Sequence, residues 1–361
     1  MVIVFRVDSS TIMGSGHLMR CLTLAKLMRN YGDVDIRFIC RDLEGNISSV
    51  VSDNDFNLIM LPAAEYNTDL SSYAAWLTVS QEQDADETID AIRSISCDFQ
   101  ADYIIVDSYA IDEIWEKKLR PYTKKIFVID DLANRKHACN YLLDQTYGIE
   151  YSSKYDGLVP PGCVQFLGTP YSLLKPEYRK LRKEIDLLRQ EIKNILVFFG
   201  GSDDTGETVK FLEALKQKRY EQYHFIVIIG SGNPQKNVIK TYCDEMDNVE
   251  FHCQIDNMEY YISISDIAFA SAGVNTWERC VLGLPSIITV TAENQQEIAA
   301  KMREQNAAVI LGDFEAVTSE DYAEALRTID EIDITSLSKN AAKLMENDGM
   351  DELLKVIGVG I

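Results

Sequence analysis

A glycine-rich turn followed by a histidine stands near the start of the chain as Gly14-Ser15-Gly16-His17. The turn comes after an apolar run at residues 2–7 and before apolar residues that recur at helical spacing from 18 to 27. We therefore expect it to lead from a buried parallel strand into a helix N-terminus. Glycine lets the backbone approach a ligand there, and unpaired N–H groups and the helix dipole attract anions. His17 adds a side chain that accepts a proton near neutral pH, so the pattern suits bond cleavage beside a phosphate.

Polar residues crowd the same turn and extend the candidate site. Candidate ligand contacts in this half of the chain are Arg6, Gly14, Gly16 and Arg20. Asp8 is a candidate either to orient His17 or to hold the substrate, and capping of the polar turn accounts for it equally well. The alternative for His17 itself is packing or capping. Its position favours a functional role, because open α/β sheets bind ligands where their strands end.

Small-residue turns also follow apolar runs in the second half of the chain. Taken singly, the turns after the runs at 195–199 and 224–229 more often serve packing than phosphate binding. The turn at 271–275 is more specific, because it opens a helix that carries Glu278 one turn in. A carboxylate there can accept both hydroxyls of a ribose, or can simply interact favourably with the helix dipole. The candidate nucleotide- and sugar-binding residues of this half are Gly200, Gly201, Ser202, Asp203, Ser231, Ile255, Ser271, Ala272, Gly273, Val274, Asn275, Glu278, Asn294 and Gln295.

Composition and charge limit the partners of the chain. Of its 361 residues 46% are hydrophobic, and 35 basic residues stand against 57 acidic ones, a formal net charge of -22. This balance disfavours nucleic acid and anionic membranes as partners but is compatible with a small anion held by backbone N–H groups. No apolar stretch approaches the roughly 20 residues of a membrane span, and no signal peptide pattern precedes the first run. We therefore expect a cytoplasmic protein that acts as a monomer.

Metal and cofactor sites are not expected. The eight cysteines include no C-x-x-C pair, which favours reduced thiols over a zinc site. Asp130 and Asp131 are adjacent, so in an extended segment they point to opposite faces and only one of them can line a ligand site.

Strand-like runs alternate with helical patterns along the whole chain, which predicts parallel α/β sheets. The expected strands are 2–7, 35–39, 57–61, 103–107, 125–130 and 141–143, and then 195–199, 224–229, 249–252, 267–270, 286–290 and 308–310. Between 147 and 176 the periodicity fades, and glycines and prolines gather.

This pattern predicts two Rossmann-like, doubly wound domains. The N-terminal domain at 1–170 carries the histidine turn, a linker helix follows at 171–192, the C-terminal nucleotide-binding domain covers 193–345, and a tail covers 346–361. Because each sheet presents its strand ends at one edge, we expect a ligand-binding cleft between the domains.

The chain resembles the UDP-2,4-diacetamido-2,4,6-trideoxy-beta-L-altropyranose hydrolases of pseudaminic acid biosynthesis. The runs that carry the resemblance are Arg6-Val-Asp8-Ser-Ser, Gly14-Ser-Gly16-His17-Leu-Met-Arg20-Cys21, Gly200-Gly-Ser-Asp203, Asn275-Thr-Trp-Glu278 and Glu293-Asn294-Gln295. That family is related to the glycosyltransferase B (GT-B) superfamily and its MurG-type members. The resemblance spans nearly the whole chain. Its N-terminal runs are specific, whereas the C-terminal ones are shared across the superfamily.

The resemblance implies the GT-B fold and a hydrolase that breaks the C1–O bond of a UDP sugar, releasing UDP and the free sugar without a metal. It implies that His17 activates water and that Tyr109, in Ile104-Ile105-Val106-Asp107-Ser108-Tyr109, approaches the reaction centre. The chain has Ser108 where the family has a histidine. The resemblance also implies that Glu278 binds the ribose and that Asn294 and Gln295 lie near the sugar. A diphosphate leaves readily, so one base for water is the main requirement.

Three other functions share these features. A MurG-like glycosyltransferase would use a lipid or protein acceptor in place of water. A hydrolysing UDP-sugar epimerase would need base chemistry at the carbon next to C1. A non-catalytic nucleotide-sugar-binding protein would bind UDP without turnover and would tolerate His17→Ala, although the intact Gly-Ser-Gly-His turn favours an enzyme.

Overall fold

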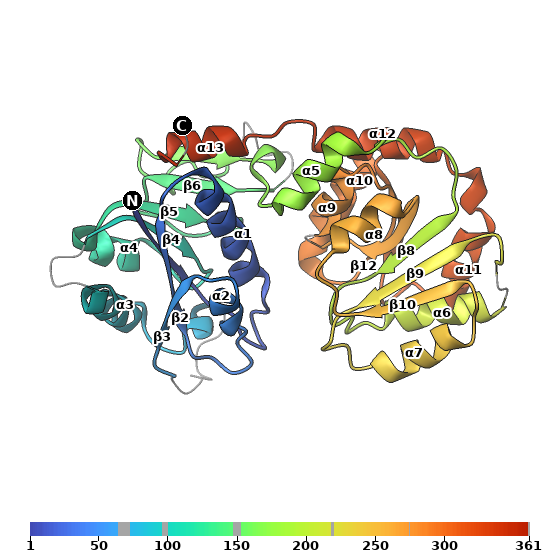
Figure 1. Ribbon diagram of the computed structural model, residues 1–361, viewed down its shortest axis with the longest axis horizontal. Coiled ribbons are helices and arrows are strands. Elements are labelled where there is room, and N and C mark those ends of the chain that lie inside the picture. Colours follow the sequence, from blue (N-terminus) through green and yellow to red (C-terminus); the bar gives the residue numbers. More distant parts are fainter. Residues whose placement is uncertain (64–72, 96–99, 147–152, 218–219, 274, 360–361) are drawn as a thin grey trace. The chain divides into compact units, whose positions relative to one another are not determined.

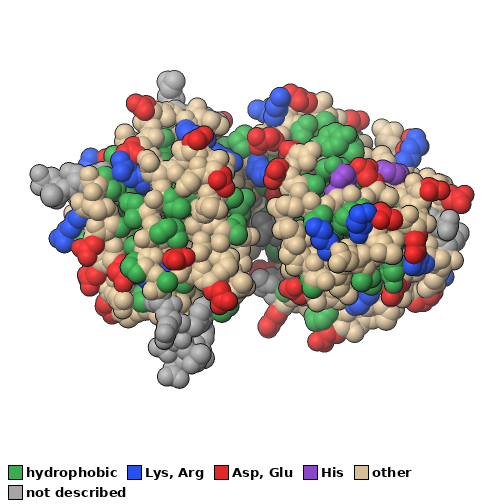
Figure 2. Space-filling model, turned by 60° about the horizontal axis from the view of Figure 1, so that its bottom comes forward, with side chains coloured by type: hydrophobic (Ala, Val, Ile, Leu, Met, Phe, Trp, Pro, Cys, Tyr) green, Lys and Arg blue, Asp and Glu red, His purple; other side chains and the backbone are tan. Residues whose placement is uncertain are grey.

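The computed structural model describes residues 1–361 apart from 64–72, 96–99, 147–152, 218–219, 274 and 360–361. The chain forms two compact units, one made of Met1–Lys175 with Asp348–Ile361 and the other of Pro176–Asn347. Each unit is a parallel sheet with helices on its faces (Figure 1). Acidic side chains are scattered over the face of each unit that Figure 2 shows, in keeping with the net charge of -22.

The first unit is built on seven parallel strands in its described part, in the order β3-β2-β1-β4-β5-β6-β7. They are β1 (Val2–Val7), β2 (Asp35–Arg41), β3 (Asn57–Leu61), β4 (Ala101–Asp107), β5 (Thr123–Ile129), β6 (Tyr141–Asp144) and β7 (Val164–Leu167). The helices are α1 (Gly16–Tyr31), α2 (Ser49–Asp53), α3 (Gln81–Ile95), α4 (Glu113–Leu119) and α13 (Met350–Val356), with short 3-10 turns η1 (Tyr73–Leu77), η2 (Arg120–Tyr122) and η3 (Thr169–Tyr171).

Strand β1 is buried on both faces, and its alternating side chains enter two different cores. Ile3, Phe5 and Val7 pack with the apolar residues of α1 and α13. Val4 packs on the opposite face with residues of α3 and α4 (Figure 1). A strand covered on both faces has a continuous apolar sequence, which explains why the run at 2–7 is so strongly hydrophobic.

The second unit has six parallel strands in its described part, in the order β10-β9-β8-β11-β12-β13. They are β8 (Asn194–Phe198), β9 (His224–Ile229), β10 (Val249–Cys253), β11 (Ile267–Ser271), β12 (Ser286–Val290) and β13 (Ala308–Asp313). The helices are α5 (Pro176–Glu184), α6 (Glu207–Gln217), α7 (Lys236–Asp244), α8 (Met258–Ile264), α9 (Asn275–Val281), α10 (Gln296–Glu304), α11 (Ser319–Arg327) and α12 (Ile334–Leu344), with 3-10 turns η4 (Glu293–Gln295) and η5 (Ile329–Glu331).

Each sheet reverses its strand order at one place. In the first unit the chain moves outward from β1 to β2 and β3 and then returns to place β4 on the other side of β1. In the second unit β8 and β11 flank the corresponding point. Connections leave in opposite directions from such a switch point, and ligands bind in the crevice that opens beyond the strand ends. The turns after β1, β4, β8 and β11 are therefore where functional residues are expected.

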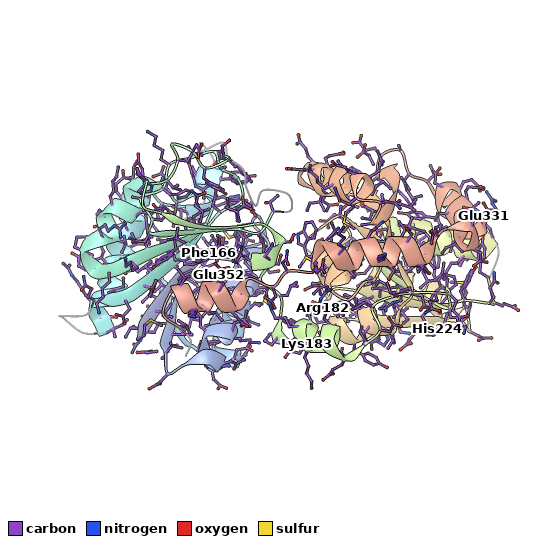
Figure 3. All side chains as sticks on the ribbon, turned by 90° about the horizontal axis from the view of Figure 1, so that it is seen from above. Phe166, Arg182, Lys183, His224, Glu331 and Glu352 are labelled. Atoms are coloured by element: carbon purple, nitrogen blue, oxygen red, sulfur yellow. The ribbon has the colours of Figure 1, made fainter. Side chains whose placement is uncertain are left out.

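All twelve predicted strands are present, with ends within three residues of the predicted ones, and β7 is an additional strand in the stretch predicted as irregular. The structure also differs from the predicted division into domains. Residues 348–361, predicted as part of a tail, belong to the first unit. Leu353 and Leu354 of α13 lie in its core, and Tyr171 donates a 3.1 Å hydrogen bond to Glu352. Figure 3 labels Glu352 on α13 and Phe166, whose ring contacts Tyr171.

Residues 176–192 of the segment predicted as a linker helix belong to the second unit, and two arginines fix them there. Arg182 of α5, labelled in Figure 3, donates to the carbonyls of Val281 at 2.6 Å and Ala342 at 3.1 Å. Arg189 is 7% exposed and donates to the carbonyls of Ser265 at 2.8 Å and Leu282 at 3.2 Å. Because the last carbonyls of a helix have no partner within it, these guanidinium groups satisfy carbonyls at the C-terminal ends of α8, α9 and α12.

Candidate active site

His17 is held by a carboxylate from the neighbouring strand. It is the second residue of α1, and its Nδ1 lies 2.6 Å from Oδ1 of Asp107, the last residue of β4. Strands β1 and β4 pair with Val7 opposite Asp107, so the switch point of the sheet brings the two side chains together. With Nδ1–H donating to the carboxylate, Nε2 carries the lone pair of the neutral ring. This arrangement is suited to a general base.

Arg20 holds the same carboxylate. Its Nε lies 2.6 Å from Oδ2 of Asp107 and its Nη2 lies 2.7 Å from Oδ1, a bidentate pair, while Nη1 reaches Asp131 at 3.1 Å. Burial acts to raise the pKa of Asp107, but the charges and hydrogen bonds of Arg20 and His17 outweigh it and hold this pKa well below its ordinary value. Asp107 is therefore ionised at neutral pH. Arg20, predicted as a ligand contact, instead positions Asp107, because all three of its donor nitrogens face these carboxylates.

Tyr109 faces His17 and is fixed at its hydroxyl. The two rings meet edge to face with centroids 4.6 Å apart, and the hydroxyl donates to Oδ1 of Asp131 at 2.5 Å. Burial and the Asp131 carboxylate raise the pKa of Tyr109 well above its ordinary value. The side chain is therefore a neutral phenol at neutral pH, which suits positioning and hydrogen bonding rather than action as a base.

Arg135 fixes the loop that carries Tyr109. It donates to the carbonyls of Ser108 at 3.0 Å and Ile111 at 2.7 Å, and it pairs with Asp130 at 2.7 Å. Asp130 is fully buried, whereas the Asp131 side chain is 26% exposed. Adjacent residues therefore face opposite sides, as predicted, and Asp131 is the one that joins the histidine site.

Two further aromatic residues, from the 3-10 turn η1, complete this part of the site. Trp76 lies 5.9 Å from His17 and 5.5 Å from Tyr109 between ring centroids, and Tyr73 lies 4.9 Å from Trp76 and 5.0 Å from Tyr109. We call Tyr73, Trp76 and Tyr109 the aromatic wall. It stands beside the histidine that carries the free Nε2.

Arg6, predicted as a ligand contact, and Asp8, predicted to orient His17, to hold the substrate or to cap the turn, both lie in a buried ionic network. Arg6 is 0% exposed and Asp8 1% exposed; Arg6 Nη1 lies 2.6 Å from Asp8, and Nη2 lies 2.5 Å from Asp84. The backbone N–H of Arg41 donates to Asp8 at 2.6 Å. Both side chains thus belong to a buried ionic network, and Asp107 takes the role of orienting His17. The sequence placed them near the histidine, but the Arg6 guanidinium and Asp8 Oδ1 are bonded within the protein, whereas Asp8 Oδ2 has no partner among the described residues.

The glycines of the first turn remain open to solvent. Gly14 and Gly16 are exposed, and a Cβ at either would meet nothing within 4 Å. Gly14 adopts a φ of 74°, and its N–H and carbonyl both bond to Ser10, which closes the turn. Ser15 precedes α1 without capping it through its side chain, so the first N–H groups of this helix keep no side-chain partner from that position.

In the second unit the turns after β8 and β9 touch. Gly230 N–H donates to the carbonyl of Gly201 at 2.9 Å, and a Cβ on Gly230 would lie 2.7 Å from that oxygen. Gly200 has a φ of 113°, a conformation that glycine adopts without strain. Gly201, Ser202 and Ser231 are exposed, and Ile255 after β10 is half-buried.

Asp203 is not available to a ligand, which corrects its predicted role. Its two carboxylate oxygens accept from the backbone N–H groups of Glu207 at 3.0 Å and Thr208 at 2.8 Å, and the residue is 5% exposed. These two bonds cap α6, whose first N–H groups need an acceptor. Burial raises the pKa of Asp203.

The turn after β11 is held from two sides. Gln295 Oε1 accepts from Ala272 N–H at 3.2 Å and from Thr291 N–H at 3.1 Å, so this amide oxygen joins the turn after β11 to the end of β12. Arg279 is 2% exposed and donates to the carbonyl of Ser271 at 2.9 Å. Burial lowers the pKa of Arg279 to about 10, so it is charged at neutral pH.

Glu278 is half-buried on α9 and accepts a short hydrogen bond from the side-chain amide of Asn275. The buried Tyr178 hydroxyl also bonds to it, and burial and Glu278 raise the pKa of that phenol. Gly273 is half-buried beside the Gln295 amide. Val274 and the side chain of Asn294 lie outside the described residues.

The structure therefore brings together His17 and Tyr109 as predicted, and adds Asp107, Asp131, Trp76 and Tyr73. A signal for the two carboxylates was present, because Asp107 ends a predicted strand and Asp131 follows the next one, and parallel strands end at one edge of the sheet. The aromatic residues of η1 had no such signal. Across the described residues, no group of three or more His, Cys, Asp or Glu side chains is placed to hold a metal ion, and no helix is both long and apolar enough to cross a membrane.

Known proteins resemble both the structure and the sequence. The solved structure of Acinetobacter baumannii MurG matches with a TM-score of 0.64 at 13% identity, covering 99% of each chain. The chain thus has the two-domain, Rossmann-like GT-B fold, and the predicted fold class is confirmed.

One family model matches part of the chain. Residues 195–353 match the family described as Glycosyltransferase family 28 C-terminal domain. Together with the fold, this match supports a relationship to the GT-B glycosyltransferase superfamily.

Two sequence relatives cover most of the chain. An uncharacterized protein of Methanocaldococcus jannaschii is 27% identical over 82% of this chain, which spans only 57% of that relative. The UDP-2,4-diacetamido-2,4,6-trideoxy-beta-L-altropyranose hydrolase of Campylobacter jejuni is 25% identical over 83% of this chain and 95% of its own length.

Proposed function

We propose that the chain is a UDP-sugar hydrolase that cleaves UDP-2,4-diacetamido-2,4,6-trideoxy-beta-L-altropyranose to UDP and the free sugar. The observation that carries this proposal is the His17–Asp107–Arg20 arrangement, in which a carboxylate 2.6 Å from Nδ1 leaves Nε2 as a base. A base held in this way suits activation of water. The identity of the sugar rests on the likeness to the Campylobacter jejuni hydrolase.

The reaction then needs one proton acceptor. His17 Nε2 removes a proton from water as the water oxygen bonds to C1 of the sugar, and the C1–O bond breaks with its electron pair going to the β-phosphate of UDP. Asp107 stabilises the imidazolium that forms, and Arg20 keeps Asp107 ionised and in place. The proton on His17 is later released to solvent. Water alone serves as the second substrate, so no cofactor takes part.

The second unit supplies nucleotide binding in this proposal. Backbone N–H groups of the turn at 200–202 and of Gly273 contact the diphosphate, and the buried Arg279 cation, bonded to Ser271, adds favourable potential there. Glu278 accepts the ribose hydroxyls, positioned by its bond from Asn275. General-base catalysis contributes about 10² to 10⁴ in rate, so binding and electrostatic stabilisation of the leaving diphosphate must supply the rest.

UDP release from the purified protein tests the function. The protein is incubated with the diacetamido-trideoxy-altrose UDP sugar, no acceptor and a chelator, in parallel with the His17→Ala variant. We expect release by the wild type and its loss in the variant, with UDP binding by calorimetry unchanged in both. Absence of release with UDP binding intact would point instead to a glycosyltransferase that needs an acceptor. Release of a sugar changed at the carbon next to C1 would identify an epimerase.

A further inference from the structure

The aromatic wall, Tyr73, Trp76 and Tyr109, has no role in the proton transfer described above. Its three rings contact each other at centroid distances of 4.9 to 5.5 Å, and two of them also contact His17. Edge-to-face and tilted contacts of this kind fix the orientation of each ring. The wall is therefore a defined surface next to the nitrogen that acts on water, and whatever binds against it lies next to the reacting carbon.

The polar groups of two wall residues have no partners. Across the part of the chain that the structure describes, neither the indole N–H of Trp76 nor the hydroxyl of Tyr73 makes a hydrogen bond. Trp76 is half-buried and Tyr73 is 39% exposed. The fully buried Trp115 behaves differently, since its indole N–H donates to Asp84 at 2.9 Å. Rings that serve only as core satisfy their polar atoms within the protein. The Trp76 donor is therefore available to a ligand.

The charge beside the wall argues against an anionic ligand. The charged groups beside it include Asp107, Asp131 and Arg20, and also Arg135, which lies 6.0 Å from the Tyr109 ring centroid and pairs with Asp130. These five groups sum to one negative charge when His17 is neutral. Asp107, Asp131 and Arg20 are bonded to one another or to His17 and Tyr109. A phosphate or carboxylate against the wall would be repelled, so the group that fits is neutral, with an apolar part for the rings and an oxygen for the indole N–H.

We propose that Tyr73 and Trp76 form a subsite for an acylamino substituent of the sugar. The acyl methyl group packs against the rings, and the amide carbonyl accepts a hydrogen bond from Trp76 Nε1–H. The subsite rests on the proposed function and deepens it, because it makes the enzyme selective for N-acylated sugars over sugars that carry hydroxyl groups at the same carbon. A site that buries a methyl group in this way discriminates by about 10- to 200-fold.

Three matched substrates test the subsite. They are the diacetamido UDP sugar and two analogues, each with one acetamido group replaced by hydroxyl. In the wild type we expect kcat/KM to be about 10- to 200-fold lower for one of the analogues. Trp76→Ala should lower kcat/KM more for the full substrate than for that analogue, so that the ratio between the two values falls toward one. Trp76→Phe keeps a ring but no N–H, so it should lose only part of this selectivity.

The controls separate selectivity from damage to the site. Tyr260→Phe, at a 51% exposed ring in the second unit, should change none of the three values. Circular dichroism and UDP binding report whether each variant is folded. An equal loss on all three substrates in Trp76→Ala would mean that the wall only supports His17, and would overturn the subsite, as would no loss at all. If the wild type releases no UDP, the proposed function fails; equilibrium binding of the same three compounds to the wild type and Trp76→Ala then decides the subsite independently.

Discussion

Asp107→Asn probes the histidine site directly while nearly preserving the shape of the side chain. The carboxylate accepts from His17 Nδ1 at 2.6 Å and from Arg20 at 2.6 and 2.7 Å. An asparagine has one accepting oxygen and a donating nitrogen, so it cannot satisfy both partners. It also removes the negative charge that stabilises an imidazolium. His17 then no longer has a fixed tautomer with its lone pair on Nε2.

The size of the effect follows from the part that His17 plays. General-base assistance is worth about 10² to 10⁴ in rate, and the same aspartate-to-asparagine change in a Ser-His-Asp triad costs about 10⁴ in kcat. We expect kcat for UDP release to fall by about 10² to 10⁴, and not below the value of His17→Ala. Because the two residues act as a unit, the double variant His17→Ala/Asp107→Asn should be no slower than His17→Ala alone.

Stability has to be measured beside activity. Removing one partner of a buried pair typically destabilises a protein by about 3–5 kcal/mol, and Arg20 retains Asp131 at 3.1 Å, which favours the lower end. Rates should therefore be compared well below the melting temperature of the variant, with UDP affinity as the control for the second unit. The role of Asp107 would be refuted if Asp107→Asn kept more than a tenth of the wild-type kcat. It would also be refuted if the double variant were slower than His17→Ala by the same factor by which Asp107→Asn alone is slower than the wild type.

Three further outcomes follow from contacts in the structure. Asp203→Ala should lower the free energy of unfolding by about 0.5–2 kcal/mol through loss of the α6 cap and leave the UDP dissociation constant unchanged; a large loss of UDP affinity with stability intact would restore Asp203 as a ligand residue. Glu278→Gln should raise the UDP dissociation constant by about 10- to 100-fold, since a hydrogen bond to a charged group is worth about 1.5–3 kcal/mol. Calorimetry showing wild-type affinity for UDP would mean that Glu278 does not bind the nucleotide. Burial acts to raise the pKa of Asp84, but Arg6 and Arg41 hold it below its ordinary value. Its contribution to stability is therefore present above about pH 4 and is lost as the pH falls further. In urea titrations from pH 7 to pH 3, Asp84→Asn should lose less free energy of unfolding than the wild type, and an equal loss in both proteins would contradict this.

The fold was predictable because buried parallel strands leave a strong mark on a sequence. A strand covered on both faces, such as β1, is apolar at nearly every position, and the small-residue turns after such runs indicated the sheet edges. The packing of α13 against the first unit was not predictable, because seven amphipathic residues do not specify which core they join. Strand β7 is short and follows a stretch rich in proline and glycine, which hid it.

The candidate site was predictable only where local sequence is sufficient. The glycine turn indicated His17, and the family resemblance indicated Tyr109. Arg6 and Asp8 are nearer to His17 in the sequence than Asp107 is, but they lie in the buried ionic network with Asp84 and Arg41. Which carboxylate meets the histidine depends on strand order, and strand order is a property of the folded sheet.

The return of residues 348–361 to the first unit has a consequence for how the chain folds during synthesis. Met350, Leu353 and Leu354 are at most 1% exposed and share a core with Phe5 and the α1 helix that carries His17. That core stays open until the ribosome has completed the whole second unit, roughly ten seconds or more at about 5–20 residues per second. Until then the apolar surface that α13 covers stays exposed in the unit that bears His17. Chaperones that shield a nascent chain would meet this protein at its N-terminal unit.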